Sequence, residues 1–238
     1  MRVLVLGAAS DAADNSSLWL VEHDGVLLVE RLVQACAGLD ARMAFAVRAQ
    51  DIRRHCIDSV IGLACPGAAV VPIAADTGGA ACTALLCIGQ IDRDDGLLIL
   101  NGNEYIDIDY LAAIKSFFRR DLDAGVLVFP SLHPRYSHVR IDDGLVVQAA
   151  EKHPISHHAS TGFTWFRRGG DFIEATQSMI RKDAHVDGRF FISLTLNELV
   201  LRQKRIGAFE IEPRRYHPLK SRQQRESFEA DGHASHAA

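Results

Sequence analysis

The 238-residue sequence lacks the usual marks of a metal-binding, disulfide-bonded or membrane-spanning protein. Its five cysteines are odd in number and contain no CxxC pair, which favours small buried side chains over metal ligands or disulfides. The 11 histidines provide no HxxxH pair on a predicted helix, so exposed loop histidines are favoured over a zinc site. No stretch approaches the roughly 18 to 20 apolar residues of a membrane span.

The sequence also lacks an excess of positive charge. A net charge of −4 gives no electrostatic reason to expect nucleic acid as a partner. The first residues, 1–7, form a short apolar run rather than the longer core of a signal peptide. We therefore expect a cytoplasmic globular protein with neither a nucleic-acid nor a membrane partner.

Short apolar strands alternate with helical periodicity in the first half of the chain. The alternation predicts an α/β fold with a doubly wound, mostly parallel, Rossmann-like sheet. The strands are expected at 2–7, 43–47, 68–73 and 97–101, and the helices at 25–37, 50–63, 79–90 and 108–118.

The second half is predicted to be richer in strands. Asp142-Asp143-Gly144 is a turn sequence that joins two short strands. Further strands are expected at 125–129, 138–141, 145–149, 161–167 and 206–211, with helices at 171–181 and 190–202. We predict one domain over 1–220 and a polar, disordered tail over 221–238.

Ligands of doubly wound sheets bind beyond the carboxyl ends of the strands. The segments that follow the predicted strands are 7–10, 76–79 and 101–103. Gly78 and Gly79 at a helix start would allow close approach of a base or phosphate, although glycines at such junctions are equally typical of simple turns.

Several motifs resemble those of bacterial sugar-phosphate nucleotidyltransferases. The chain is similar to the glucose-1-phosphate thymidylyltransferase-like group of the NTP-transferase superfamily. It is most similar to short members found with polysaccharide biosynthesis genes, which often carry the label glycosyltransferase family 2. The resemblance is carried by residues 78–86, 133–137, 150–156, 161–166, 179–184, 197–199 and 204–207.

The resemblance implies a reaction in which an NTP and a sugar 1-phosphate give an NDP-sugar and pyrophosphate. In such enzymes Mg²⁺ and cationic side chains neutralise charge on the phosphates. A glycine-rich loop with an arginine holds the triphosphate, and a lysine after a proline contacts the α-phosphate. Two aspartates bind metal, while a Glu-Lys pair and a Thr-Gly pair line the sugar pocket.

The residues implied for the sugar pocket are present in this chain. They are Gly78, Gly79, Gly125, Glu151, Lys152, Thr161 and Gly162. The alternative for Glu151 and Lys152 is a solvated surface ion pair that contributes little.

The residues implied for the triphosphate are largely replaced. The nucleotide would lie against Gly7, Ala8, Ala9 and Gly102, but the loop 7–15 has no arginine and carries two acids, which repel phosphate. Leu18 stands at the lysine position and Asn103 at the position of the first metal-binding aspartate. The second aspartate would fall in 221–224, which contains no acid.

These replacements favour a nucleotidyltransferase-like protein of surface-polysaccharide biosynthesis with weak or no NDP-sugar synthesis. The alternative is an active enzyme with a rebuilt Mg²⁺ site that uses Glu104, or Asp11 and Asp14. Asp107 is expected to cap a helix that begins near Ile108. Mg²⁺ would be a cofactor only of the active form.

Two further alternatives stay open. One is a non-catalytic partner that regulates a true transferase. The other is a glycosyltransferase that uses the Asp-Ile-Asp sequence of 107–109. The expected ligand is a sugar phosphate or a nucleotide sugar, and either a homo-oligomer or a complex with a partner transferase fits this interpretation.

Overall fold

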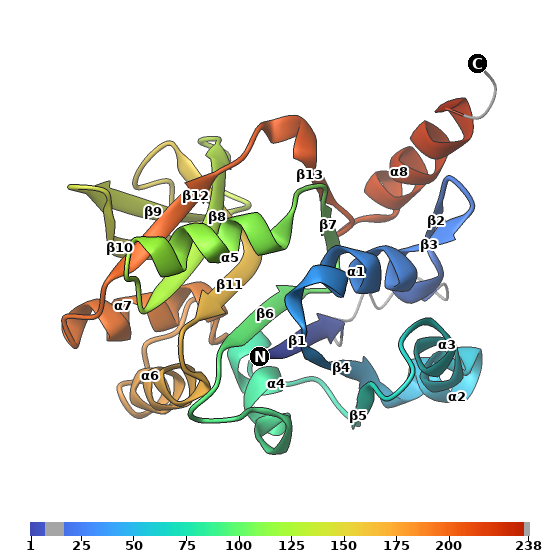
Figure 1. Ribbon diagram of the computed structural model, residues 1–238, viewed down its shortest axis with the longest axis horizontal. Coiled ribbons are helices and arrows are strands. Elements are labelled where there is room, and N and C mark those ends of the chain that lie inside the picture. The colour runs from blue at the N-terminus through green and yellow to red at the C-terminus, as the bar shows by residue number, and fades with distance from the viewer. Residues whose placement is uncertain (8–16, 236–238) are drawn as a thin grey trace.

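A nine-stranded mixed sheet forms the centre of the protein (Figure 1). The computed structural model describes residues 1–7 and 17–235. Four neighbouring strands are parallel, in the order β5-β4-β1-β6, and they begin at residues 69, 42, 2 and 97. Their bounds are β1 Arg2–Gly7, β4 Arg42–Arg48, β5 Ala69–Ile73 and β6 Leu97–Asn101. The strand order reverses direction between β1 and β6, which is where doubly wound sheets bind ligands.

The second half of the chain extends this sheet with strands of both directions. β11 runs antiparallel to β6 and to β8, and β12 adds to β8 in parallel. The bounds are β8 Ala124–Pro130, β9 Ser137–Asp142, β10 Leu145–Glu151, β11 His158–Phe166 and β12 Ile206–Glu210. Asp143 and Gly144 both have positive φ, as a two-residue hairpin turn requires. The predicted α/β fold with a strand-rich second half is confirmed.

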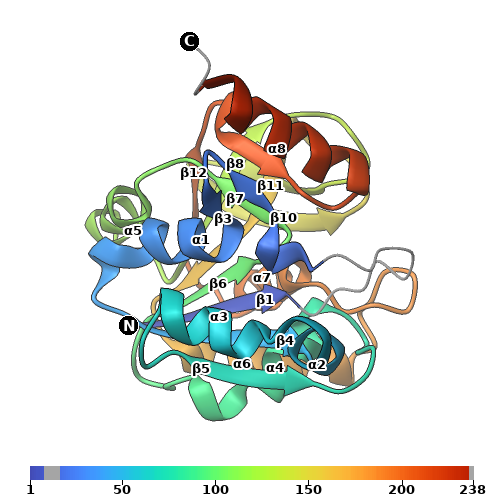
Figure 2. The same ribbon diagram turned by 90° about the vertical axis from the view of Figure 1, so that its right-hand side faces the viewer.

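Alternate residues of β1 face opposite sides of the sheet, and a different set of helices covers each side. Val3 and Val5 pack against α1 (Leu28–Cys36), α3 (Ile57–Ala64) and α5 (Tyr110–Arg119). Leu4 and Leu6 pack against α4 (Ala80–Leu86), α6 (Gly169–Arg181) and α7 (Ile192–Leu201). Figure 2 shows the helices on both sides of the sheet. A strand buried on both faces accounts for the continuous apolar sequence of 3–6.

Two predicted helices differ in detail from the observed ones. The helix predicted over 50–63 is divided into α2 (Ala49–His55) and α3, because Cys56 between them adopts a left-handed conformation with φ of 50°. The helix α5 begins at Tyr110, and its cap is Asp109, whose carboxylate accepts a hydrogen bond from the Ala112 amide at 3.0 Å. The prediction that Asp107 caps this helix is therefore wrong; Asp107 pairs with Arg215 at 2.6 Å.

The segment 221–235 is not the disordered tail that its polar sequence suggested. It forms α8 (Arg222–Ser235), and Phe228 on this helix is buried against His23, Tyr105 and His217. Just before it, β13 (Tyr216–Pro218) pairs with β7 (Glu104–Ile106). One apolar residue at the right position thus anchors an otherwise polar helix.

The remaining elements are short. They are the hairpin β2 (Glu22–His23) and β3 (Val26–Leu27), and four single turns of 3-10 helix at Leu18–Leu20, Ala37–Leu39, Ile88–Gln90 and Pro213–Arg215. Within residues 1–7 and 17–235, none of the helices has the length and apolarity needed to cross a membrane.

Candidate functional site

A pocket of about 330 Å³ opens beyond the carboxyl ends of β1 and β6, at the reversal of strand order. Its lining comes from segments that are far apart in sequence. Neutral polar side chains on the lining include Thr77, Thr83, Asn101, Asn103, Ser160, Thr161 and Thr164, and charged ones include Asp76, Arg135, Glu151, Lys152, Arg189 and Lys220. Such a pocket can form many hydrogen bonds and holds more cations than carboxylates, which suits a hydroxyl-rich, anionic ligand.

Glu151 is held in the pocket by two hydroxyl groups. It is the last residue of β10, and one of its carboxylate oxygens accepts hydrogen bonds from Ser137 and, at 2.9 Å, from Ser193. Ser137 begins the neighbouring strand β9, whereas Ser193 lies in the first turn of α7. The predicted alternative of a solvated Glu-Lys pair is not observed, because neither contact involves Lys152.

Lys152 follows Glu151 in a left-handed conformation, with φ of 55°, and turns toward another part of the chain. Its ammonium lies 2.9 Å from the Asp187 carboxylate and 5.8 Å from the centroid of the Phe191 ring. Both partners belong to the segment before α7. Lys152 and Arg189 therefore form the cationic end of the pocket on this side.

Thr161 and Gly162 lie where the pairing of β11 with β8 is interrupted. Both residues line the pocket. A Cβ atom on Gly162 would overlap the Asn101 side chain, so only glycine fits here. The Gly162 amide donates a hydrogen bond to the buried carboxylate of Glu104.

Gly78 and Gly79 start α4, but the chain that approaches them is the protein's own. The Phe190 amide donates to the Gly78 carbonyl at 2.7 Å, and a Cβ atom on Gly79 would lie 2.5 Å from the Phe190 carbonyl oxygen. Gly79 also has φ of 118°, which strongly favours glycine. Gly79 lines the pocket, whereas Gly78 fixes the segment that carries Arg189 and Phe191.

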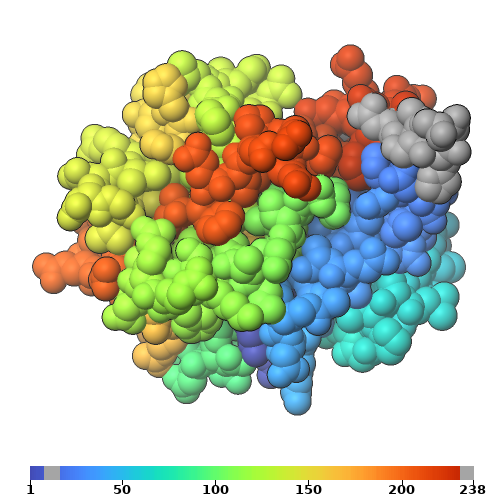
Figure 3. Space-filling model, turned by 45° about the horizontal axis from the view of Figure 1, so that its top comes forward, coloured from blue at the N-terminus to red at the C-terminus, as the bar shows by residue number. Residues whose placement is uncertain are grey.

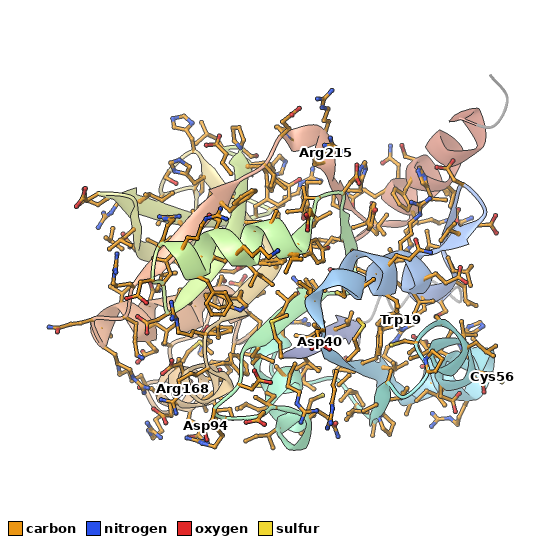
Figure 4. All side chains as sticks on the ribbon, in the orientation of Figure 1. Trp19, Asp40, Cys56, Asp94, Arg168 and Arg215 are labelled. Atoms are coloured by element: carbon orange, nitrogen blue, oxygen red, sulfur yellow. The ribbon has the colours of Figure 1, made fainter. Side chains whose placement is uncertain are left out.

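The strand ends on the predicted nucleotide side are filled by an indole ring. Trp19, labelled in Figure 4, is fully buried and meets the Phe45 ring edge-on, with the two ring centroids 5.8 Å apart. A Cβ atom on Gly7 would overlap this ring, and one on Gly102 would lie 3.2 Å from it. Leu18, at the expected lysine position, packs half-buried against the same core. Gly7 and Gly102 thus make room for Trp19 in the described structure.

Asn103 lines the pocket next to this region. Its side-chain oxygen is buried and accepts no hydrogen bond within the described part of the chain. Glu104, predicted as a replacement metal ligand, is 2% exposed, and its oxygens accept hydrogen bonds from Gly162 and, at 3.1 Å, from Tyr216. Burial raises the pKa of Glu104, although Lys220 and these two donors oppose the shift. Glu104 therefore joins strands rather than facing the pocket.

The described residues do not fit a Mg²⁺ ion. Over 1–7 and 17–235 no group of three or more His, Cys, Asp or Glu side chains could hold a metal. Mg²⁺ in nucleotide sites usually takes one or two carboxylates, and this position offers one neutral amide oxygen with Lys220 in the same pocket. The predicted residues Ala8, Ala9, Asp11 and Asp14 lie outside the described residues.

Gly125, like Gly78, was predicted for the pocket but does not line it. It lies within β8, and a Cβ atom on it would overlap the Phe117 ring of α5. The glycine is therefore required by helix-sheet packing, and its neighbour Val126 lines the pocket instead.

Sequence reasoning missed several pocket residues. Ser137 and Ser193 hold Glu151, while Arg189 and Lys220 add charge from two other segments. Single serines and basic residues on loops carry no spacing signal. A signal did exist for the position of Lys220: the Ser-x-x-Gln sequence of 221–224 is typical of a helix start.

Comparison with known proteins shows which fold surrounds this pocket. No family model and no curated protein matches the chain. A nucleoside-diphosphate-sugar pyrophosphorylase from Vibrio cholerae matches 97% of this chain and 100% of its own, with a TM-score of 0.80 and 20% identity. A proposed glucose-1-phosphate thymidylyltransferase from Bacillus anthracis, solved with sucrose, matches 97% and 94% of the two chains, with a TM-score of 0.74 and 16% identity.

A third solved structure agrees with these two. It is the inositol-1-phosphate CTP transferase from T. maritima, which matches 97% of this chain and 96% of its own, with a TM-score of 0.72 and 14% identity. All three are sugar-phosphate or polyol-phosphate nucleotidyltransferases by name. The chain therefore has the sugar-phosphate nucleotidyltransferase fold, and the resemblance stated from its motifs is confirmed at the level of the fold.

Proposed function

We propose that this protein binds a sugar phosphate or a nucleotide sugar in the pocket and makes NDP-sugars weakly or not at all. The observation that carries the proposal is the contrast between the polar surroundings of Glu151 and the apolar surroundings of Trp19. The carboxylate of Glu151 is held by Ser137 and Ser193 at a polar, cationic pocket. On the other side, Trp19 fills the strand ends, and the pocket is lined by Asn103, at a position where the resemblance implies a metal-binding aspartate.

The electrostatics support a bound phosphate without supporting a triphosphate-Mg²⁺ complex. Arg135, Lys152, Arg189 and Lys220 supply positive charge, and the neutral polar floor offers donors and acceptors to sugar hydroxyls. Loss of a single charged contact to a transition state typically costs a factor of about 10² to 10³ in rate. The resemblance implies a lysine and an aspartate where this chain has Leu18 and Asn103. We therefore predict little turnover.

A role in surface-polysaccharide biosynthesis is proposed from the motifs shared with short members of that group. The three solved relatives support it only through their fold. A protein in such a pathway that binds without turnover would act on a partner transferase. Association with that partner belongs to the same proposal.

The test is a thermal-shift screen with nucleoside triphosphates, NDP-sugars and sugar 1-phosphates, each with MgCl₂ and with EDTA. A ligand at 100 times its Kd stabilises the folded state by about 2.7 kcal/mol, which shifts the melting temperature visibly. We expect stabilisation by sugar 1-phosphates or NDP-sugars. A pyrophosphate-release assay with each triphosphate then measures turnover.

The outcomes separate the alternatives. Mg²⁺-dependent stabilisation by one triphosphate together with rapid pyrophosphate release contradicts the proposal and identifies an active enzyme with a rebuilt metal site. Turnover of an NDP-sugar with an acceptor identifies a glycosyltransferase. Stabilisation by no ligand in the screen removes the binding role and leaves a partner function.

A further inference from the structure

Lys220 reaches the Asn103 end of the pocket because the C-terminal segment pairs with β7. Pro218 lies opposite Glu104 in the antiparallel ladder, and the Leu219 amide donates to the Asn103 carbonyl at 2.9 Å. The next residue is Lys220, which lines the pocket together with Asn103. Figure 3 shows this C-terminal stretch, in orange to red, crossing the surface of the molecule before α8.

The backbone at Lys220 is fixed on its other side by the start of α8. The Ser221 hydroxyl accepts a hydrogen bond from the Gln224 amide at 3.3 Å. In return the Gln224 side-chain oxygen accepts from the amides of Lys220 and Ser221, at 3.0 and 3.1 Å. This reciprocal pattern is a capping box, which sets the direction in which the chain enters a helix. Only the side chain of Lys220 is left to adjust to a ligand.

Two cations of the pocket lining lie near the same aromatic ring at this end. The Lys220 ammonium lies 5.9 Å from the centroid of the Tyr136 ring, and the Arg135 guanidinium lies 5.8 Å from the same centroid. Both side chains are exposed and line the pocket. Lys220 acts electrostatically on the buried Glu104 carboxylate and opposes the rise of its pKa, but the hydrogen bonds of that carboxylate come from Gly162 and Tyr216 rather than from Lys220.

We propose that Lys220, with Arg135, binds the phosphate group of the ligand at the Asn103 end, so that binding there needs no divalent cation. An ammonium is a compact charge with three donors, which suits phosphate oxygens. The buried oxygen of Asn103 would accept a hydrogen bond from a ligand hydroxyl. The inference rests on the proposed function, because it concerns the same pocket and the same class of ligand.

The experiment is calorimetric titration of the full chain with glucose 1-phosphate, UDP-glucose and inorganic phosphate, in EDTA and in excess MgCl₂. For at least one probe we expect the same Kd in both solutions. Lys220→Gln is expected to raise that Kd about tenfold or more, because the loss of a hydrogen bond to a charged group typically weakens binding by about this factor. Lys220→Arg keeps the charge and retains most of the affinity.

A matched control tests whether loss of any lysine has this effect. Lys115 is exposed on α5 and away from the pocket lining, so Lys115→Gln leaves the Kd unchanged. Asn103→Asp adds a carboxylate beside Lys220 and is expected to weaken binding in EDTA. Melting temperatures of all variants confirm that each one folds.

Chemical labelling of the unmodified protein provides a second test. Acetic anhydride modifies exposed lysines, and glucose 1-phosphate in EDTA should protect Lys220 but not Lys115. Binding that requires MgCl₂, an unchanged Kd for Lys220→Gln, or equal labelling of both lysines would overturn the inference while the proposed function stands. Failure of every probe to bind in either solution would overturn both.

Discussion

The two sides of the pocket are built on different principles. On the β10 side, polar groups are held by other polar groups, as Glu151 is held by Ser137 and Ser193. On the β1 side, glycines make room for a large apolar ring, as Gly7 and Gly102 do for Trp19. Both sides belong to one chain with the nucleotidyltransferase fold, which matches solved structures with TM-scores of 0.72 to 0.80.

Under the proposed function, the polar half of the site binds the ligand, whereas the half that contains Trp19 belongs to the core. Carboxylates fixed by hydroxyl groups remain available to a ligand because their other lone pairs face the pocket. The buried indole of Trp19 on the other side contributes to stability, and its ring nitrogen is buried without a hydrogen-bond partner among the described residues. Substitutions on either side of the pocket test this contrast.

Trp19→Ala should lower the free energy of unfolding by about 3–5 kcal/mol, because a fully buried aromatic side chain leaves a large cavity. Urea denaturation followed by circular dichroism measures the change. Leu63, which is 84% exposed, is the control, and Leu63→Ala should change stability by less than about 0.5 kcal/mol. Equal effects of the two substitutions would show that the β1 side is not core.

Gly162→Ala should destabilise the protein by about 1–3 kcal/mol, because its Cβ would overlap Asn101. Gly89→Ala is the matched control, since a Cβ there meets nothing within 4 Å. Thermal unfolding compares the two variants. If Gly162→Ala were as stable as Gly89→Ala, the tight contact between β11 and β6 at the pocket floor would be contradicted.

Glu151→Gln should weaken the binding of the sugar phosphate or nucleotide sugar found in the screen by about tenfold. The reason is that a carboxylate accepts stronger hydrogen bonds from ligand hydroxyls than an amide does. Calorimetric titration measures the Kd. Glu210→Gln, at an exposed position on β12, should leave it unchanged. An unchanged Kd for Glu151→Gln would show that the ligand does not bind on the β10 side of the pocket.

Glu104→Gln should have a small effect that depends on pH. Because burial raises the pKa of the folded-state carboxyl above its ordinary 4.5, the stability it contributes is complete below pH 4.5 and is lost as pH rises through the raised value. Glutamine resembles the protonated acid. The unfolding free energy of the natural protein minus that of the variant should therefore fall as pH rises from 4 to 7.

The measurement is urea denaturation of both proteins at several values of pH. Subtraction removes the contributions of all other groups that titrate alike in the two proteins. A difference that rises with pH would show that Tyr216, Gly162 and Lys220 together hold a negative charge on Glu104 more strongly than burial opposes it.

Much of the fold could be predicted from sequence because local pattern and global structure agree. The run 3–6 is apolar without interruption, as a strand buried on both faces must be, and Asp143-Gly144 directly specifies the turn between β9 and β10. The break at Cys56 could not be predicted, because neither its residue type nor its neighbours favour a left-handed conformation.

The candidate site was predictable only where the motifs lie on one segment. Glu151 and Thr161-Gly162 were identified from short contiguous motifs, and the structure brings them into one pocket. Gly125 was assigned to the pocket, but its contact is with Phe117, a distant residue that no local pattern indicates. Lys220 was missed for a related reason, since β13 and β7 are joined only by tertiary pairing.

The pairing of β13 with β7 also bears on how this protein is made. A ribosome releases Asn103 well before Lys220, so the parallel strands can form while the pocket still lacks its last wall. The pocket is completed only when the segment through Ser221 has left the exit tunnel. Nascent chains that stop short of this segment would lack the Lys220 wall at the Asn103 end of the pocket.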